Sequence, residues 1–356
     1  MPTPTNEIFS RRLLQARRMQ GLSLAEVREK IGDIVTIAAL SKYEKGLSMA
    51  SSKVLIALSD ALDVTTDFFF RDFEVELKRI RFRKLTKVPA KDIASIREHA
   101  KDFFEKYFRI EEITGAQKPY QSILKVGQAL DPEAMAEAVR NKWGIGNDPI
   151  PNVHALLEDN GIKVWYPQNC NPDFDGFSAA TDRGPVAVVS NSIGAPRKRM
   201  TALHELAHIL LEPFDLDEKT EEPLVRDFTS AILLPKKALI DAMGETRKKL
   251  QFEELFQIKE RFGISVAGII MRAHRLGIIN DSLYTGFFRF GAGKKWRSER
   301  KEPRDDKLGI LFPESHNRYR QLVFRAYAEE LITLAQAAEF LACTVDQARH
   351  QLDATT

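Results

Sequence analysis

One segment constrains the fold of this chain more than any other. From Arg199 to Leu211 the sequence reads Arg-Met-Thr-Ala-Leu-His-Glu-Leu-Ala-His-Ile-Leu-Leu, and after Ala202 its only polar side chains are those of His204, Glu205 and His208. A helix this apolar belongs in a core, where polar side chains without partners are costly. The segment therefore predicts a buried helix that carries a polar site.

The spacing of the three polar residues indicates the kind of site. His204 and His208 are one helical turn apart, so both can offer a ring nitrogen to the same ion. Glu205 lies about 100° away around the helix, which suits a general base that reaches a water molecule beside the ion. We predict a zinc site and a metal-dependent hydrolase; the alternative is two structural histidines in a core helix.

A third metal ligand has to come from another segment, because catalytic zinc sites usually have three protein ligands and one open position. The next expected helix runs from Glu222 to Pro235, with Pro223 in its first turn. Glu222 is the first candidate, and Glu221 and Asp227 are the alternatives. Glu222 could also be a charge that the helix dipole favours at a helix start.

These two segments together resemble the ImmA/IrrE family of metallopeptidases. The residues that match in register are Arg199, Thr201, His204, Glu205, Leu206 and His208, followed by Glu222, Phe228, Leu233 and Pro235. The second segment departs from the family pattern at Val225, Arg226, Thr229 and Ile232. The resemblance implies a zinc peptidase with His204, His208 and Glu222 as metal ligands and Glu205 as the base, acting on repressor-type partners.

Three short strands are expected before the predicted metal helix. One follows a helix and the glycine stop at Gly161, one follows the Phe174-Asp-Gly turn, and one spans residues 185–191. They predict a small sheet whose edge could hold an extended substrate by strand addition.

The first 70 residues carry an independent signal, a series of short helical segments separated by turns. The string Ala39-Leu-Ser-Lys-Tyr-Glu-Lys-Gly46 resembles the helix-turn-helix of the phage-repressor-like (XRE) family. That resemblance implies a recognition-helix face at the major groove made by Thr36, Ala38, Ala39, Ser41, Lys42 and Lys45, with Leu40 and Tyr43 packed inward. The candidate phosphate contacts are Arg11, Arg12, Arg17, Arg18 and Lys53. The alternative is a helical bundle that binds protein.

Charge alone does not identify a nucleic-acid-binding protein here, because the 53 Lys and Arg residues are nearly balanced by 50 Asp and Glu residues, which leaves a net charge of +3. Basic residues do cluster at 78–91 and 289–304. We interpret both clusters as solvated connections, with DNA-backbone contacts as the alternative. Two distant cysteines, no apolar stretch long enough to span a bilayer and no signal-like start favour a cytoplasmic protein.

The expected fold is mainly α with a small β-sheet, an α+β protein. We predict four segments: a five-helix helix-turn-helix domain at 1–72, a basic connector and helical linker at 73–130, a zincin-like metallopeptidase domain at 131–285, and a basic segment with a helical C-terminal domain at 286–356. Thr333 and Thr344 are expected to cap two short helices of the last segment.

The predicted function joins these parts. A homodimer would bind a double-stranded DNA operator, an inverted repeat that mirrors its symmetry. Its zinc peptidase would cleave a repressor-type or antitoxin-type protein, or the chain itself, in response to a signal such as stress. The alternative is a transcription factor or antitoxin whose peptidase-like domain senses, dimerises or binds a partner without catalysis.

Overall fold

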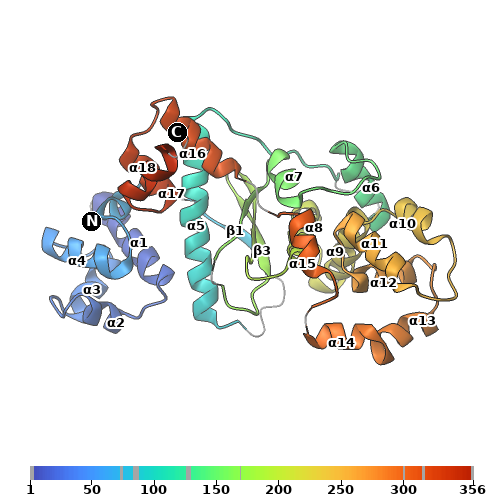
Figure 1. The fold of residues 1–356 in the computed structure, drawn as a ribbon. Coiled ribbons are helices and arrows are strands. Elements are labelled where there is room, and N and C mark those ends of the chain that lie inside the picture. The colour runs from blue at the N-terminus through green and yellow to red at the C-terminus, as the bar shows by residue number, and fades with distance from the viewer. Residues whose placement is uncertain are drawn as a thin grey trace. The chain divides into compact units, whose positions relative to one another are not determined.

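The computed structural model describes residues 4–72, 75–82, 88–125, 130–168, 170–299, 301–314 and 317–353. It is mainly helical with one four-stranded sheet, which confirms the predicted α+β class (Figure 1). The chain forms two compact units, the first made of Met1–Leu77 and Leu85–Glu112, the second of Lys78–Lys84 and Ile113–Thr356. The predicted connector at 73–130 is thus divided between the two units.

The first unit contains short helices followed by one long helix. In chain order these are α1 (Pro4–Met19), α2 (Leu24–Lys30), α3 (Ile37–Glu44), α4 (Ser52–Leu62), the 3-10 helix η1 (Thr66–Phe70) and α5 (Ala90–Ile113). Ser23 and Thr36 cap α2 and α3 with their hydroxyl oxygens, which fixes where both helices begin. Phe9, Leu58 and Phe69 are fully buried in the core of these helices.

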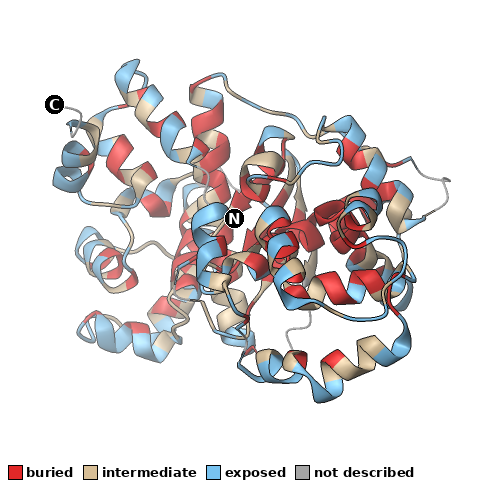
Figure 2. Ribbon diagram, turned by 45° about the vertical axis from the view of Figure 1, so that its right-hand side comes forward, coloured by how far each residue is buried: buried red, intermediate tan, exposed pale blue. Residues whose placement is uncertain are grey.

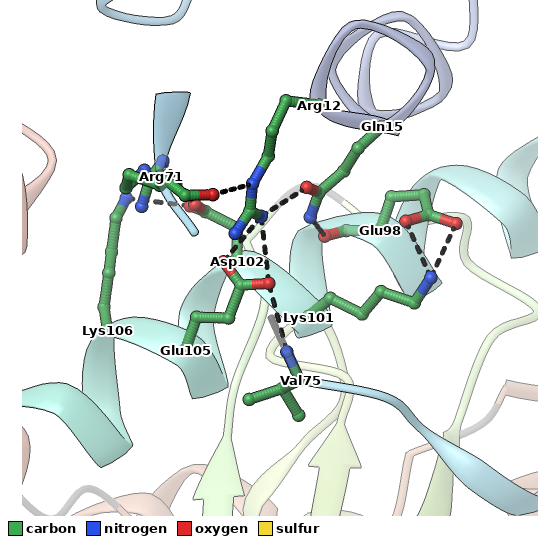
Figure 3. A network of polar contacts seen from close by, with 9 residues as sticks. All are labelled: Arg12, Gln15, Arg71, Val75, Glu98, Lys101, Asp102, Glu105 and Lys106. Carbon is green, nitrogen blue, oxygen red and sulfur yellow. Dashed lines mark hydrogen bonds and ion pairs between the residues drawn. The ribbon is translucent and has the colours of Figure 1, made fainter. Parts of the chain in front are cut away.

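A buried polar network joins α1 to α5 within the first unit (Figure 3). The Arg12 guanidinium donates to both carboxylate oxygens of Glu105, at 3.0 and 2.8 Å, and to the Arg71 carbonyl at 2.9 Å. Arg12 and Glu105 are each only 3% exposed. The prediction that Arg12 contacts a DNA phosphate is therefore wrong, because its side chain is enclosed and held by these partners.

The sheet belongs to the second unit and has the strand order β1-β3-β4-β2. Its strands are β1 (Lys78–Phe82), β2 (Lys163–Trp165), β3 (Gly176–Thr181) and β4 (Gly184–Val189). β3 and β4 form an antiparallel hairpin, β2 pairs parallel with β4, and β1 pairs antiparallel with β3. The three strands expected from the sequence are β2, β3 and β4, whereas β1 lies in a segment that we predicted to be a connector.

Helices make up the rest of the second unit. They are α6 (Pro132–Lys142), α7 (Val153–Asp159), α8 (Ala195–Leu211), η2 (Glu212–Phe214), α9 (Glu218–Leu233), α10 (Lys236–Met243), α11 (Phe252–Phe262), α12 (Val266–Arg275), α13 (Asp281–Thr285), the π-helix η3 (Gly286–Phe290), α14 (Ala292–Glu299), α15 (Asp305–Leu311), α16 (Arg318–Ala328), α17 (Leu334–Leu341) and α18 (Val345–Asp353). Many helices are buried along one side and exposed along the other (Figure 2). Thr333 and Thr344 accept the expected capping hydrogen bonds. No helix within the described ranges combines the length and apolar character needed to cross a membrane.

Candidate metal centre

Helix α8 lies in the core of the second unit, as its sequence predicts. Leu203, Leu206 and Leu210 are fully buried, and the helix packs against β3, β4 and α9. His204 and His208 are each 5% exposed and Glu205 is 0% exposed. All three polar side chains are therefore enclosed by the apolar packing that surrounds α8.

The two histidines point their rings at one place. Their Nε2 atoms are 3.2 Å apart. Two imidazole nitrogens bound to one tetrahedral zinc ion, each at about 2.0–2.1 Å, are separated by about 3.3 Å. The observed spacing of the nitrogens thus fits a shared zinc ion.

Helix α9 begins earlier than predicted and changes the role of its proline. Its first residue is Glu218, because the Asp217 side chain accepts a hydrogen bond from the Thr220 backbone N–H at 3.0 Å and caps the helix there. Pro223 therefore lies inside α9, and our placement of it in the first turn is wrong. The earlier start carries both Glu221 and Glu222 into the helix, next to His208.

The three candidate acids occupy different positions around His208. Glu222 Oε1 is 3.7 Å from His208 Nε2, and Glu222 and both histidines offer ligand atoms within 4.8 Å of one another. Glu221 Oε1 instead lies 2.8 Å from Nδ1, the other ring nitrogen of His208. Asp227 pairs with Arg226 and Arg275 at 3.5 and 2.5 Å. Glu222 thus lies with the two histidines as a possible metal ligand, whereas Glu221 contacts the opposite side of the His208 ring.

The surrounding charges act on the protonation of His208. Burial disfavours its charged form, but the hydrogen bond to Glu221 and the nearby carboxylates of Glu205 and Glu222 outweigh burial, so the pKa of His208 is raised above its usual value. A raised pKa makes the imidazole more basic, and metal binding requires its neutral form.

Gly176 brings β3 close to Glu205. A Cβ atom at this position would lie 2.6 Å from the Val188 carbonyl oxygen and 2.9 Å from Thr201 Cγ2. It would also lie 3.6 Å from Glu205 Oε1. Only glycine fits this crossing, which explains the Asp-Gly turn before β3 and places the start of β3 beside the candidate base.

A buried ion pair anchors α8 one turn before the site. Arg199 is 0% exposed; it pairs with Glu314 and donates to the Ile150 carbonyl at 2.7 Å. Glu314 also accepts hydrogen bonds from the first backbone N–H groups of α7, at 2.9 and 3.1 Å. Sequence reasoning noted Arg199 as a motif match but missed Glu314, which follows it by 115 positions and belongs to no local pattern.

The candidate recognition helix α3 has an exposed face. Thr36, Ala38, Lys42 and Lys45 are exposed and Ser41 is partly buried, whereas Leu40 is 1% exposed and packs inward as expected. Arg18 is half exposed. Arg17 differs from the prediction, because its Nε and Nη2 donate to the two carboxylate oxygens of Glu44, at 2.5 and 2.9 Å, and its Nη1 donates to the Leu22 carbonyl at 2.8 Å.

Comparison with known families finds two domains in this chain. Residues 13–69 match the family described as Helix-turn-helix, and residues 157–274 match the IrrE N-terminal-like domain. The chain carries both of these domains. The two resemblances predicted from the sequence are thus confirmed.

A curated relative is similar to part of this chain. It is the protein named "Uncharacterized HTH-type transcriptional regulator y4aM" from Sinorhizobium fredii (strain NBRC 101917 / NGR234). It is 40% identical over 70 residues, which cover 20% of this chain and 48% of that protein. The chain therefore spans about half the length of the curated relative that it matches.

The departures from the family pattern along α9 do not keep Glu222 away from the two histidines. Val225, Thr229 and Ile232 are buried in the core side of α9, and the Thr229 hydroxyl donates to the Val225 carbonyl at 2.6 Å. Arg226 is 57% exposed. These changes alter packing and surface along α9 while Glu222 still approaches the histidine pair.

Proposed function

We propose that this chain is a DNA-binding transcriptional regulator whose IrrE N-terminal-like domain is a zinc-dependent peptidase. Its substrate is a repressor-type or antitoxin-type protein, or the chain itself. The observation that carries the proposal is the pair of Nε2 atoms 3.2 Å apart, with a carboxylate from the next helix beside them and Glu205 enclosed on the same helix.

Each residue of the centre has a role in this proposal. His204, His208 and Glu222 would hold the metal, and Glu221 would orient His208 by accepting its Nδ1–H, as carboxylates do for metal-ligating histidines. Zinc, when bound, supplies a Lewis acid that polarises a carbonyl and acidifies water. Glu205 would accept the proton that water gives up during attack on the peptide bond.

The helix-turn-helix domain would bring the protein to its operator. The exposed face of α3 would enter the major groove, with Thr36, Ala38 and Ser41 near base edges and Lys42 and Lys45 beside them. Arg18 would contact the phosphate backbone, whereas Arg17 would chiefly hold the domain together through Glu44. A homodimer would match an inverted-repeat site.

Two variants test the peptidase in living cells. Protein N-termini are compared by mass spectrometry between cells that make the wild-type chain, Glu205→Gln or His204→Ala. The proposal expects a set of new N-termini in wild-type cells that both variants lose, while Glu205→Gln protein still contains zinc. If all three strains show the same N-termini and Glu205→Gln regulates transcription normally, the domain senses or binds without catalysis.

A further inference from the structure

Strand β1 lies at one edge of the sheet, and its neighbour β3 starts beside Glu205. β3 pairs with β4 along one side and with β1 along the other (Figure 1). Arg81 lies opposite Ser178 and Phe82 opposite Phe177, close to Gly176, where β3 passes beside Glu205. Without β1, the outer edge of β3 would offer its backbone N–H and C=O groups to another extended chain.

β1 is an addition to the domain that contains the centre. The match to the IrrE N-terminal-like domain begins at residue 157, well after β1 in the chain. Residues before and after β1 in the chain, up to Leu77 and from Leu85, belong to the other unit. β1 is thus a short insertion into this sheet from the segment that follows the helix-turn-helix domain.

The pairing of β1 with β3 is irregular. The register shifts between Lys78 and Arg81, and Arg79 has a φ of 48°. A left-handed conformation is unfavourable for a residue with a Cβ atom. The irregularity weakens the attachment of β1, so its release costs less than that of a regular strand.

Charge complementarity adds specificity to this edge. All three basic side chains of β1 pair with acids of the second unit: Lys78 with Asp182 at 2.8 Å, Arg79 with Glu212, and Arg81 with Glu221 at 3.7 Å. Glu221 is 4% exposed and also holds His208. These acids therefore favour a strand with several basic side chains, one of which pairs with Glu221, the acid that contacts His208.

We infer that the outer edge of β3 is the docking edge for an extended, arginine-containing peptide and that β1 is the chain's own occupant of that edge. A substrate strand must displace β1, because both would use the same backbone groups of β3. The inference rests on the proposed peptidase function. It adds the class of substrate, an arginine-containing peptide, and the segment that blocks its binding, β1. Apparent affinity for a peptide is then reduced by the fraction of molecules in which β1 is bound.

The test uses a fluorescein-labelled peptide copied from residues 76–84, Glu-Leu-Lys-Arg-Ile-Arg-Phe-Arg-Lys. Its binding to the full chain carrying Glu205→Gln, which prevents cleavage, is measured by fluorescence anisotropy. Ile80→Pro/Arg81→Pro removes backbone N–H groups on both sides of β1, and Ile80→Ala/Arg81→Ala is the matched control that keeps them. The proline variant is expected to bind the peptide about tenfold more tightly than the control. A peptide with citrulline at the positions copied from Arg79 and Arg81 is expected to lose this gain.

A second variant holds β1 in place, so the inference can be tested even if the proline variant does not fold. Lys78 and Ala180 are paired across the two strands, so Lys78→Cys/Ala180→Cys, in a chain with Cys170→Ser and Cys343→Ser, can be oxidised to fix β1 in place. Oxidation is expected to lower peptide affinity about tenfold and reduction to restore it.

Equal affinities in the open, control and locked proteins would overturn the inference, as would cleavage of the wild-type chain within residues 78–84, which would make β1 a substrate. Zinc content of the same samples separates the two proposals. If the protein contains zinc but the proline variant binds the peptide no more tightly than its control, the docking edge is contradicted and the peptidase proposal is not. A gain in zinc-free protein supports the edge and counts against the peptidase.

Discussion

Helices α3 and α8 carry the two sets of candidate functional residues, and they differ most in burial. α3 leaves Thr36, Ala38 and Lys42 exposed on a single face. On α8, by contrast, His204, Glu205 and His208 are almost completely buried. An exposed face suits recognition of a large charged partner, whereas an enclosed group of ligands and a base suits chemistry that depends on low local dielectric. The burial of a polar side chain thus helps to distinguish a recognition surface from a site for chemistry.

The largest expected effect comes from removing the enclosed base. Glu205→Gln should lower the cleavage rate about 10²- to 10⁴-fold, because a positioned general base contributes about that much, and zinc content should stay the same. Cleavage is measured on a substrate found through the new N-termini, with Glu218→Gln on the exposed start of α9 as the control. Unchanged cleavage by Glu205→Gln would show that Glu205 is not the general base.

Breaking the buried pair of the first unit tests whether enclosure there is purely structural. Arg12→Ala should cost about 1–3 kcal/mol of unfolding free energy, because it leaves the buried Glu105 carboxyl, which can take up a proton, without its main hydrogen-bond partner. The exposed Arg18→Ala should change it by less than about 0.5 kcal/mol. Urea unfolding measures both, and equal effects of the two variants would contradict the assigned network.

Glu221→Gln tests whether Glu221 binds the metal itself or only orients His208. Loss of the carboxylate charge at His208 Nδ1 should weaken zinc affinity about 10- to 100-fold, since partners of metal-ligating histidines contribute that much. Competition with a chromophoric chelator measures the affinity. Complete loss of zinc would instead make Glu221 the third ligand, and no change would assign it neither role.

On the exposed side, Lys42→Ala should weaken operator binding modestly and reduce the slope of log affinity against log salt by about 1, if Lys42 neutralises one phosphate. Zinc content and thermal stability should not change, because Lys42 is exposed on α3. Anisotropy titrations at several salt concentrations measure the slope. A large loss of stability in this variant would show that α3 is not a free face.

The smallest expected effect is a pH dependence of the first unit. Burial raises the pKa of Glu105 to about 7, against an ordinary value of 4.5, although Arg12 acts in the opposite direction. Folding therefore favours the protonated carboxyl, so this contribution to stability is full below about pH 4.5 and is lost as the pH rises through 7. Unfolding free energies of wild type and Glu105→Gln between pH 5 and 8 should differ in slope, and parallel curves would contradict the shift.

Local patterns predicted much of this molecule. Helical period, capping residues and the Asp-Gly turn were sufficient for α7, α8 and the β3–β4 hairpin, because each is determined by neighbours in the chain. The start of α9 was misplaced because Pro223 was weighed above the Asp217 cap. β1 was missed because its partner, β3, is about 100 positions away and its basic residues resemble a connector. Arg12 and Glu314 show the same limit, since their partners are distant in sequence.

The most direct measurement is anomalous diffraction at the zinc edge from crystals of full-length protein purified without added metal. We expect one peak about 2.0–2.2 Å from His204 Nε2, His208 Nε2 and a Glu222 oxygen, with Glu221 hydrogen-bonded to His208 Nδ1. Absence of any peak there after soaking in zinc, with the two imidazoles bonded to each other, would contradict it.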